Sequence, residues 1–145
     1  MLRLIQINST VRDIKGNIDQ IVARLTQCQT SSSPNETPLC IFPEMAICGY
    51  PPEDLLLRRS FQTACMEATQ ALANRTKDEL PAMVVGGIWH ENNQLFNAGF
   101  YLSEGNIQHI HKKVMLPNEG VFDEKRYFAT GQAPLIFEHA GMKIG

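Results

Sequence analysis

The stretch LCIFPEMAICGYPPEDLLLR, residues 39–58, carries the clearest structural signal in the sequence. Its first four residues are apolar and stop at Pro43, which is typical of a short buried strand. Glu44 follows directly, at the carboxyl end of this strand, where open α/β sheets usually bind their ligands. The glycine and prolines of residues 49–52 make a stiff corner, and such a corner can hold a general base in place. Position alone does not decide whether Glu44 has a function or is a solvated acid on a loop, and both interpretations fit it equally well.

Strand and helix signals alternate before this stretch. Residues 2–8 are strand-like, and a helix follows, with Asn17 expected as its N-cap. The apolar residues of this helix recur at helical spacing: Ile18, Ile21, Val22, Leu25 and Cys28. The polar residues 30–38 predict a turn that leads into the strand at residues 39–42. The chain therefore opens as a β-α-β unit.

The same alternation continues after residue 58. Phe61, Cys65, Ala68 and Leu72 share one face of a second expected helix. Strands are then expected at residues 82–89, 95–102, 107–113 and 135–138, with another beginning at residue 142. The pair Gly86-Gly87 inside the first of these strands indicates a close approach by another backbone. The order of elements predicts an α/β fold with a mixed sheet and helices on one face.

Length and composition limit the classes of protein that remain. The chain has 145 residues, 43% of them hydrophobic, and its 13 basic and 15 acidic residues give a net charge of −2. This balance suits one globular domain and argues against disorder, a nucleic-acid partner or a membrane surface. The N-terminal apolar stretch is too short for a signal peptide or a membrane span. We expect a cytoplasmic protein with reduced cysteines.

Lys113 is the second candidate for chemistry. It ends the strand IQHIHKK at residues 107–113, and a lysine near an acid can stabilise an oxyanion. Lys112 and Lys113 must point to opposite faces of that strand, so only one of them can face a site. The competing interpretation, favoured for an isolated lysine pair, is that both are solvated and protect an exposed sheet edge.

The sequence supports a metal site or a reactive cysteine less well than it supports roles for Glu44 and Lys113. His109 and His111 share a face at strand spacing, but no third ligand has a matching spacing, so we expect no metal site. The four cysteines form no C-x-x-C pair. Cys40 lies inside an apolar strand as a small buried hydrophobic residue, and Cys48 has no identified base to activate it.

Two segments resemble a known family. FPEMAICGYPPEDLLLR, residues 42–58, and KVMLPNEGVFDEKRYF, residues 113–128, resemble the glutaminase part of glutamine-dependent NAD+ synthetases, within the nitrilase or carbon-nitrogen hydrolase superfamily. The resemblance implies a nitrilase-type α-β-β-α sandwich, of which residues 1–145 would form the first half. It also implies glutamine as substrate, with the released ammonia used to amidate nicotinic acid adenine dinucleotide.

The resemblance assigns roles to individual residues. In this family a cysteine thiolate attacks the amide carbon, a glutamate moves the proton and a lysine stabilises the oxyanion. Glu44 matches the glutamate and Lys113 the lysine. Tyr50, Phe122 and Glu124 match positions that line the glutamine pocket or support the base. Glu119 departs from the family pattern, which commonly has an aromatic residue after Leu-Pro-Asn.

The resemblance also sets expectations about what lies outside the chain. The family's nucleophilic cysteine would follow Gly145, as would the rest of the glutaminase domain and a synthetase domain that uses ATP and Mg2+. We therefore expect residues 1–145 to be an N-terminal part of a larger enzyme and to be inactive alone. The resemblance further implies a homo-oligomer. The alternatives are a stand-alone nitrilase-type amidase and a non-catalytic binding or assembly module.

Overall fold

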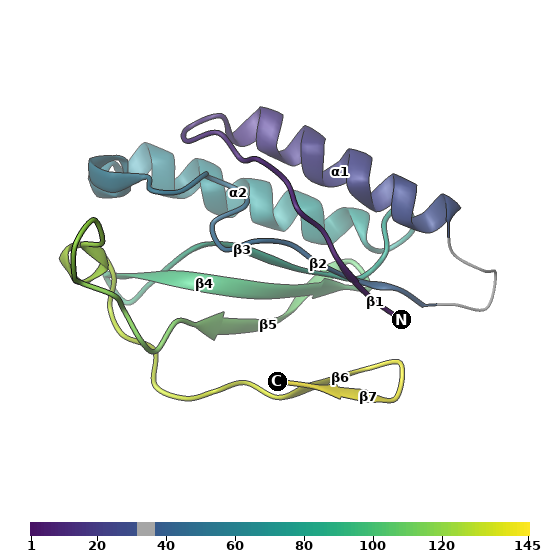
Figure 1. Cartoon of the computed structure of the whole chain (residues 1–145). Helices are drawn as coiled ribbons and strands as arrows, with labels where there is room; N and C mark the ends of the chain where they lie inside the picture. The colour runs from purple at the N-terminus through teal and green to yellow at the C-terminus, as the bar shows by residue number, and fades with distance from the viewer. Residues whose placement is uncertain (32–36) are drawn as a thin grey trace.

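Seven strands and two long helices occur in the computed structural model, which describes residues 1–31 and 37–145 (Figure 1). In chain order the elements are β1 (Leu2–Leu4), α1 (Ile14–Thr30), β2 (Leu39–Ile41), the 3₁₀ turn η1 (Glu53–Leu57), α2 (Arg59–Arg75), β3 (Met83–Glu91), β4 (Gln94–Ser103), β5 (Asn106–Lys112), the 3₁₀ turn η2 (Glu124–Arg126), β6 (Phe137–His139) and β7 (Met142–Ile144). Residues 32–36 of the expected turn lie outside the described residues.

The first five strands form one mixed sheet in the order β1-β2-β3-β4-β5. β1, β2 and β3 are parallel, whereas β4 is antiparallel to both β3 and β5. β2 and β5 therefore run in the same direction and end at the same edge of the sheet. Glu44 and Lys113, which follow these two strands, are brought together by this topology. The expected mixed sheet is confirmed.

Strand β1 is shorter than expected. It ends at Leu4, and only the Ile5 N–H continues the pairing, by donating to the Ile41 carbonyl at 2.8 Å. The partner strand β2 ends before Pro43, which has no N–H to offer, so the ladder cannot extend across residues 5–8.

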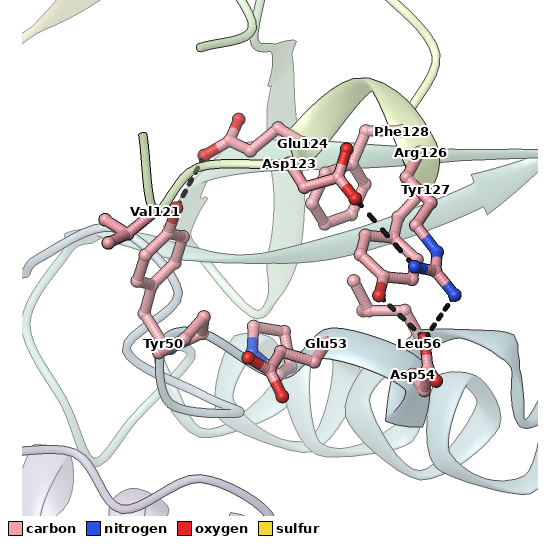
Figure 2. Close-up of a pocket in the computed structure, with 12 residues that line it drawn as sticks. Tyr50, Glu53, Asp54, Leu56, Val121, Asp123, Glu124, Arg126, Tyr127 and Phe128 are labelled. Carbon is pink, nitrogen blue, oxygen red and sulfur yellow. Dashed lines mark hydrogen bonds and ion pairs between the residues drawn. The ribbon is translucent and has the colours of Figure 1, made fainter. Parts of the chain in front are cut away.

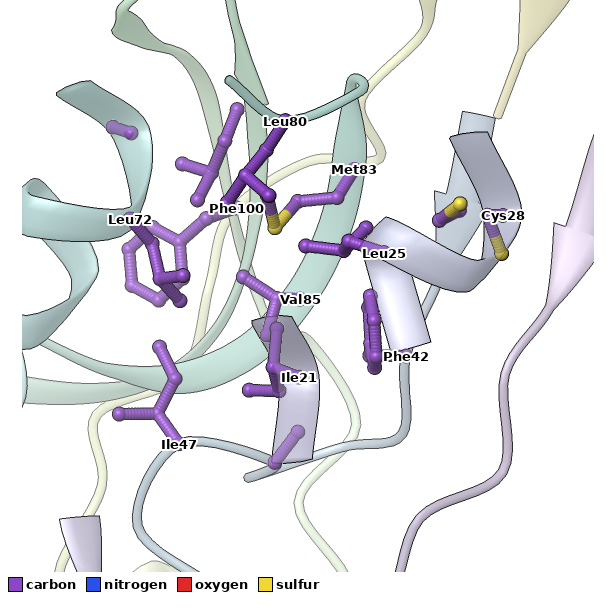
Figure 3. Packing of buried hydrophobic residues seen from close by; sticks show 14 of the residues in the cluster. Ile21, Leu25, Cys28, Phe42, Ile47, Leu72, Leu80, Met83, Val85 and Phe100 are labelled. Atoms are coloured by element: carbon purple, nitrogen blue, oxygen red, sulfur yellow. The ribbon is translucent and has the colours of Figure 1, made fainter. Parts of the chain in front are cut away.

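Helices α1 and α2 cover one face of the sheet, as expected (Figure 1). Ile21 and Leu25 from α1 and Leu72 from α2 pack with Val85 and Phe100 from the sheet, and all five are buried (Figure 3). The helical spacing of the apolar residues thus identified the buried faces of both helices. At roughly 25 cal/mol for each Å² of buried apolar surface, this core is the main source of stability.

The N-cap of α1 differs from the expectation. Asp13 caps the helix, and its carboxylate accepts the Gly16 N–H at 3.0 Å. Asn17 instead lies buried in the first turn, where its amide accepts from the Thr10 N–H and donates to the carbonyls of Thr10 and Ile47. The N-cap prediction for Asn17 was wrong because this side chain joins two loops rather than capping its own helix.

A second layer of strands begins on the opposite face of the sheet. The β6–β7 hairpin lies on the side away from the helices (Figure 1), and Phe137 stacks on Tyr101 with ring centroids 4.3 Å apart. The buried His139 accepts from the Tyr101 hydroxyl at Nδ1, 2.9 Å away, because its Nε2–H donates to the Thr37 carbonyl. Helices, sheet and hairpin thus form three successive layers.

Candidate active site

Glu44 is positioned by a sharp turn after β2. Met45, the next residue, has φ +54°, in the left-handed region that non-glycine residues seldom occupy. The backbone of residues 43–45 crosses β3 directly over Gly86, where a Cβ would collide with it. Gly86 therefore lets the turn lie flat on the sheet, and the close approach predicted at this glycine is confirmed. The side chain of Glu44 is 48% exposed at the sheet edge.

Lys113 is held by backbone hydrogen bonds on both sides. Its N–H donates to the Asn97 carbonyl at 2.9 Å, and its own carbonyl accepts from the Gly131 N–H at 2.9 Å. Lys112 points to the other face, where it pairs with Glu91 and lies 4.5 Å from the centre of the Phe96 ring. Both lysines form ion pairs and are about 70% buried, so they are not solvated edge lysines.

The Lys113 ammonium bridges two carboxylates. Its Nζ lies 2.8 Å from Oε1 of Glu44 and 3.0 Å from Oε1 of Glu124. Burial by itself lowers the pKa of Lys113, but the hydrogen bonds to Glu44 and Glu124 outweigh it and hold this pKa above its ordinary value. Lys113 thus stays charged, as a group that stabilises a developing negative charge must.

Asn97 completes the contacts of Glu44. It lies on β4, is 3% exposed, and donates from Nδ2 to Oε1 of Glu44 at 2.5 Å. Asn97 was not among the residues predicted from the sequence. The available signal was a polar side chain inside the otherwise apolar strand LFNAGFYL, since a buried amide must find a partner.

Tyr50 and Glu124 are also brought to this site. Glu124 is 4% exposed and accepts at Oε1 from the Tyr50 hydroxyl, 3.2 Å away (Figure 2). Burial and the adjacent Glu124 charge raise the pKa of Tyr50, which keeps its hydroxyl a donor. Phe122 is 43% exposed, with its ring centroid 6.4 Å from that of Tyr50. Glu119 is exposed and makes no side-chain hydrogen bond within the described part of the chain.

A cavity of about 330 Å³ opens beside Tyr50 and Glu124, between η1 and η2 (Figure 2). Arg126 crosses its far side and pairs with Asp54 at 3.2 Å and Asp123 at 4.0 Å. The Tyr127 hydroxyl also donates to Asp54, at 2.7 Å. Four carboxylates and one guanidinium line this cavity, so it favours a ligand with N–H donors.

Neither a metal centre nor a reactive thiol occurs in residues 1–31 and 37–145. No group of three histidine, cysteine or acidic residues there could hold a metal ion, and His109 stacks on Tyr101. All four cysteines are buried and reduced. Burial and the neighbouring Cys28 raise the pKa of Cys40 to about 12, and a hydrogen bond with Cys65 together with burial raises the pKa of Cys48. The thiols of Cys40 and Cys48 therefore stay protonated at neutral pH.

The two long helices of the described part of the chain have 17 residues each, and neither is long and apolar enough to cross a membrane.

The sequence and the structure of this chain are both similar to those of glutamine-dependent NAD+ synthetases. Glutamine-dependent NAD(+) synthetases from Thermotoga maritima and Aquifex aeolicus are 35% and 37% identical over 142 and 143 residues, which is 98% and 99% of this chain. The chain spans only 24% of the length of either relative. A glutamine-dependent NAD+ synthetase structure from Acinetobacter baumannii has a TM-score of 0.86 and 34% identity over 98% of this chain and 26% of that one.

More distant structures share the fold. An amidase from Nesterenkonia sp. has a TM-score of 0.79 over 98% of this chain and 52% of that one, at 18% identity. The expected nitrilase-type architecture is thereby confirmed. The carbon-nitrogen hydrolase family model matches residues 1–145, the full length given, and the chain belongs to this family.

Proposed function

We propose that residues 1–145 form the N-terminal part of a glutaminase domain, in which Glu44 is the general base and Lys113 the oxyanion-stabilising residue. The observation that carries the proposal is the shared contact of Lys113 with Glu44 and Glu124, at 2.8 and 3.0 Å. A carboxylate beside a charged lysine is what amide hydrolysis requires of the residues around a nucleophile. We assign Tyr50, Phe122 and Glu124 to binding of glutamine or support of the base.

The reaction needs a nucleophilic thiol, and the four cysteines of the chain are all buried. We assign the nucleophile to a cysteine after Gly145. Its S–H proton passes to Glu44, and the thiolate attacks the glutamine amide carbon. Lys113 stabilises the negative charge on the amide oxygen, and Glu44 returns the proton as ammonia leaves. Water then hydrolyses the acyl-enzyme.

The relatives named glutamine-dependent NAD(+) synthetase support a proposal for the use of the ammonia. We propose that a synthetase domain outside this chain consumes it in the ATP- and Mg2+-dependent amidation of nicotinic acid adenine dinucleotide. Residues 1–145 then need no cofactor of their own, and their partners are glutamine and that domain. Residues 1–145 alone should release no ammonia from glutamine.

Mutation of the full-length protein tests this proposal. Glu44→Gln and Lys113→Ala should each lower glutamine-dependent NAD+ formation by at least about 100-fold, while ammonia-dependent formation stays near the wild-type rate. Lys112→Ala is the matched control, because Lys112 is the neighbouring lysine on the opposite face of β5. Loss of both activities in Glu44→Gln or Lys113→Ala would show that these residues support folding instead.

The alternatives make different predictions. A stand-alone amidase would release ammonia from glutamine without forming NAD+ from added ammonia and ATP. A binding module would do neither. The intact mass of the native protein also separates them, since a binding module made of this chain alone would have a mass near 16.3 kDa.

A further inference from the structure

We propose that Asn97 is a positioning residue that fixes the orientation of the Glu44 carboxylate and leaves its Oε2 as the proton-accepting oxygen. The inference rests on the proposed function of Glu44. It starts from the position of Asn97 on β4, between β2, which precedes Glu44, and β5, which precedes Lys113.

The side chain of Asn97 can approach Glu44 in only one way. An ionised carboxylate accepts hydrogen bonds and donates none, so the amide must present its NH2 group. Nδ2 lies 2.5 Å from Oε1 of Glu44, and Lys113 Nζ lies 2.8 Å from the same oxygen. Within residues 1–31 and 37–145, both side-chain donors to Glu44 converge on Oε1. Oε2 is then the oxygen left to exchange a proton with a ligand or nucleophile.

The environment of Asn97 makes this contact rigid. Asn97 is 3% exposed, in the nine-residue antiparallel ladder between β3 and β4, opposite Ile88. Glu44, in contrast, is on a turn and its side chain is 48% exposed. A flexible, half-exposed carboxylate gains a fixed orientation when a buried donor on a rigid strand holds one of its oxygens.

The backbone of Asn97 positions the second residue of the site. Its carbonyl accepts the Lys113 N–H at 2.9 Å, one residue beyond the end of β5. One residue therefore contacts Glu44 through its side chain and Lys113 through its backbone. Substitution of the side chain removes only the first of these contacts, so the effect on Glu44 can be measured separately.

Two variants of the full-length protein test the inference. Asn97→Leu removes the N–H donors at similar volume, and Asn97→Asp keeps the shape but, when ionised, offers no donor. Each should lower kcat for glutamine hydrolysis by about 10- to 100-fold, with the KM for glutamine within about two-fold, because a base displaced by about 1 Å loses rate rather than binding. Tyr101→Phe is the matched control, since it removes a buried hydrogen bond from the same strand away from Glu44.

A crystal structure of Asn97→Leu supplies a readout that is independent of activity. The Glu44 carboxylate should rotate or move by about 1 Å, while Lys113 keeps its backbone bond to residue 97. A Glu44 carboxylate that stays in place, or a wild-type kcat in either variant, would overturn the inference. If the wild-type protein fails to hydrolyse glutamine, the proposed function falls, and the Glu44 position in Asn97→Leu still supports or refutes the positioning role.

Discussion

Substitution of Gly86 by alanine should displace Glu44 without touching its side chain. A Cβ at Gly86 would lie 2.5 Å from the Met45 nitrogen and 2.7 Å from both the Glu44 Cα and the Pro43 carbonyl oxygen. Ordinary contacts of a methyl carbon are about 3.5 Å, so these atoms must move by about 1 Å. All three are backbone atoms, and no side-chain rotation can relieve the contact. The turn that carries Glu44 must therefore rise from the sheet.

The expected costs concern both stability and rate. Inserting one methyl group into packed backbone typically costs about 1–3 kcal/mol of unfolding free energy, which lowers Tm by roughly 3–10 °C for a chain of this size. A shift of about 1 Å in Glu44 should reduce glutamine-dependent turnover by about 100-fold. Differential scanning calorimetry of the full-length protein measures the first effect, and activity assays of the same protein measure the second.

Gly99 provides a matched control, because it pairs directly with Gly86 across the β3–β4 ladder. A Cβ at Gly99 would meet nothing within 4 Å. Gly99→Ala should therefore keep a Tm within about 2 °C of wild type, because it adds β-propensity without a collision. Equal Tm values for Gly86→Ala and Gly99→Ala, with Glu44 unmoved in a crystal structure, would refute the reasoning.

Two further predictions concern single interactions. Because the pKa of Lys113 is raised on folding, its ion pairs stabilise the fold fully below its ordinary pKa of 10.5 and lose this effect as pH rises through the folded value. Between pH 9 and 12, the free energy of unfolding in urea should therefore fall more steeply with pH in the wild type than in Lys113→Met. Equal slopes against pH in the two proteins would contradict this prediction. Tyr101→Phe should lower the free energy of unfolding by about 1–3 kcal/mol, because Nδ1 of the buried His139 loses its hydrogen-bond donor. The ring at position 101 still stacks on Phe137. A cost below about 0.5 kcal/mol in urea unfolding would argue against this role.

The order of elements could be predicted from local patterns because each element carries its own signal. Ile21 and Leu25 recur at helical spacing in α1, as Cys65 and Leu72 do in α2, and both helices bury these residues. Ends of elements were harder to predict, since they depend on partners distant in sequence. β1 ends where β2 stops pairing, and Asn17 bonds to the Ile47 carbonyl instead of capping its helix.

The residues of the candidate site differ in how far their positions could be inferred from the sequence. Glu44 and Lys113 follow strand ends, so their positions could be inferred from the topology rule for α/β sheets. Asn97 lies within a strand, and a polar residue there fits an ordinary buried hydrogen bond as well as a functional one. Only the three-dimensional structure shows that its partner, 53 residues away in the chain, is Glu44.

The two glutamates that share Lys113 have environments that suit them to different tasks. Glu124 is 4% exposed and its Oε1 accepts from both Tyr50 and Lys113, whereas its buried Oε2 has no hydrogen-bond partner in the described part of the chain. Glu44 contacts the same ammonium, but its side chain is 48% exposed. The Asn97 contact occupies Oε1 and leaves Oε2 for proton exchange. A ligand can reach the exposed Glu44 carboxylate, whereas the Glu124 carboxylate is buried against Tyr50 and Lys113. Both carboxylates hold the pKa of Lys113 above its ordinary value. This difference supports the proposal that Glu44 exchanges a proton with the nucleophile while Glu124 holds Lys113 in place.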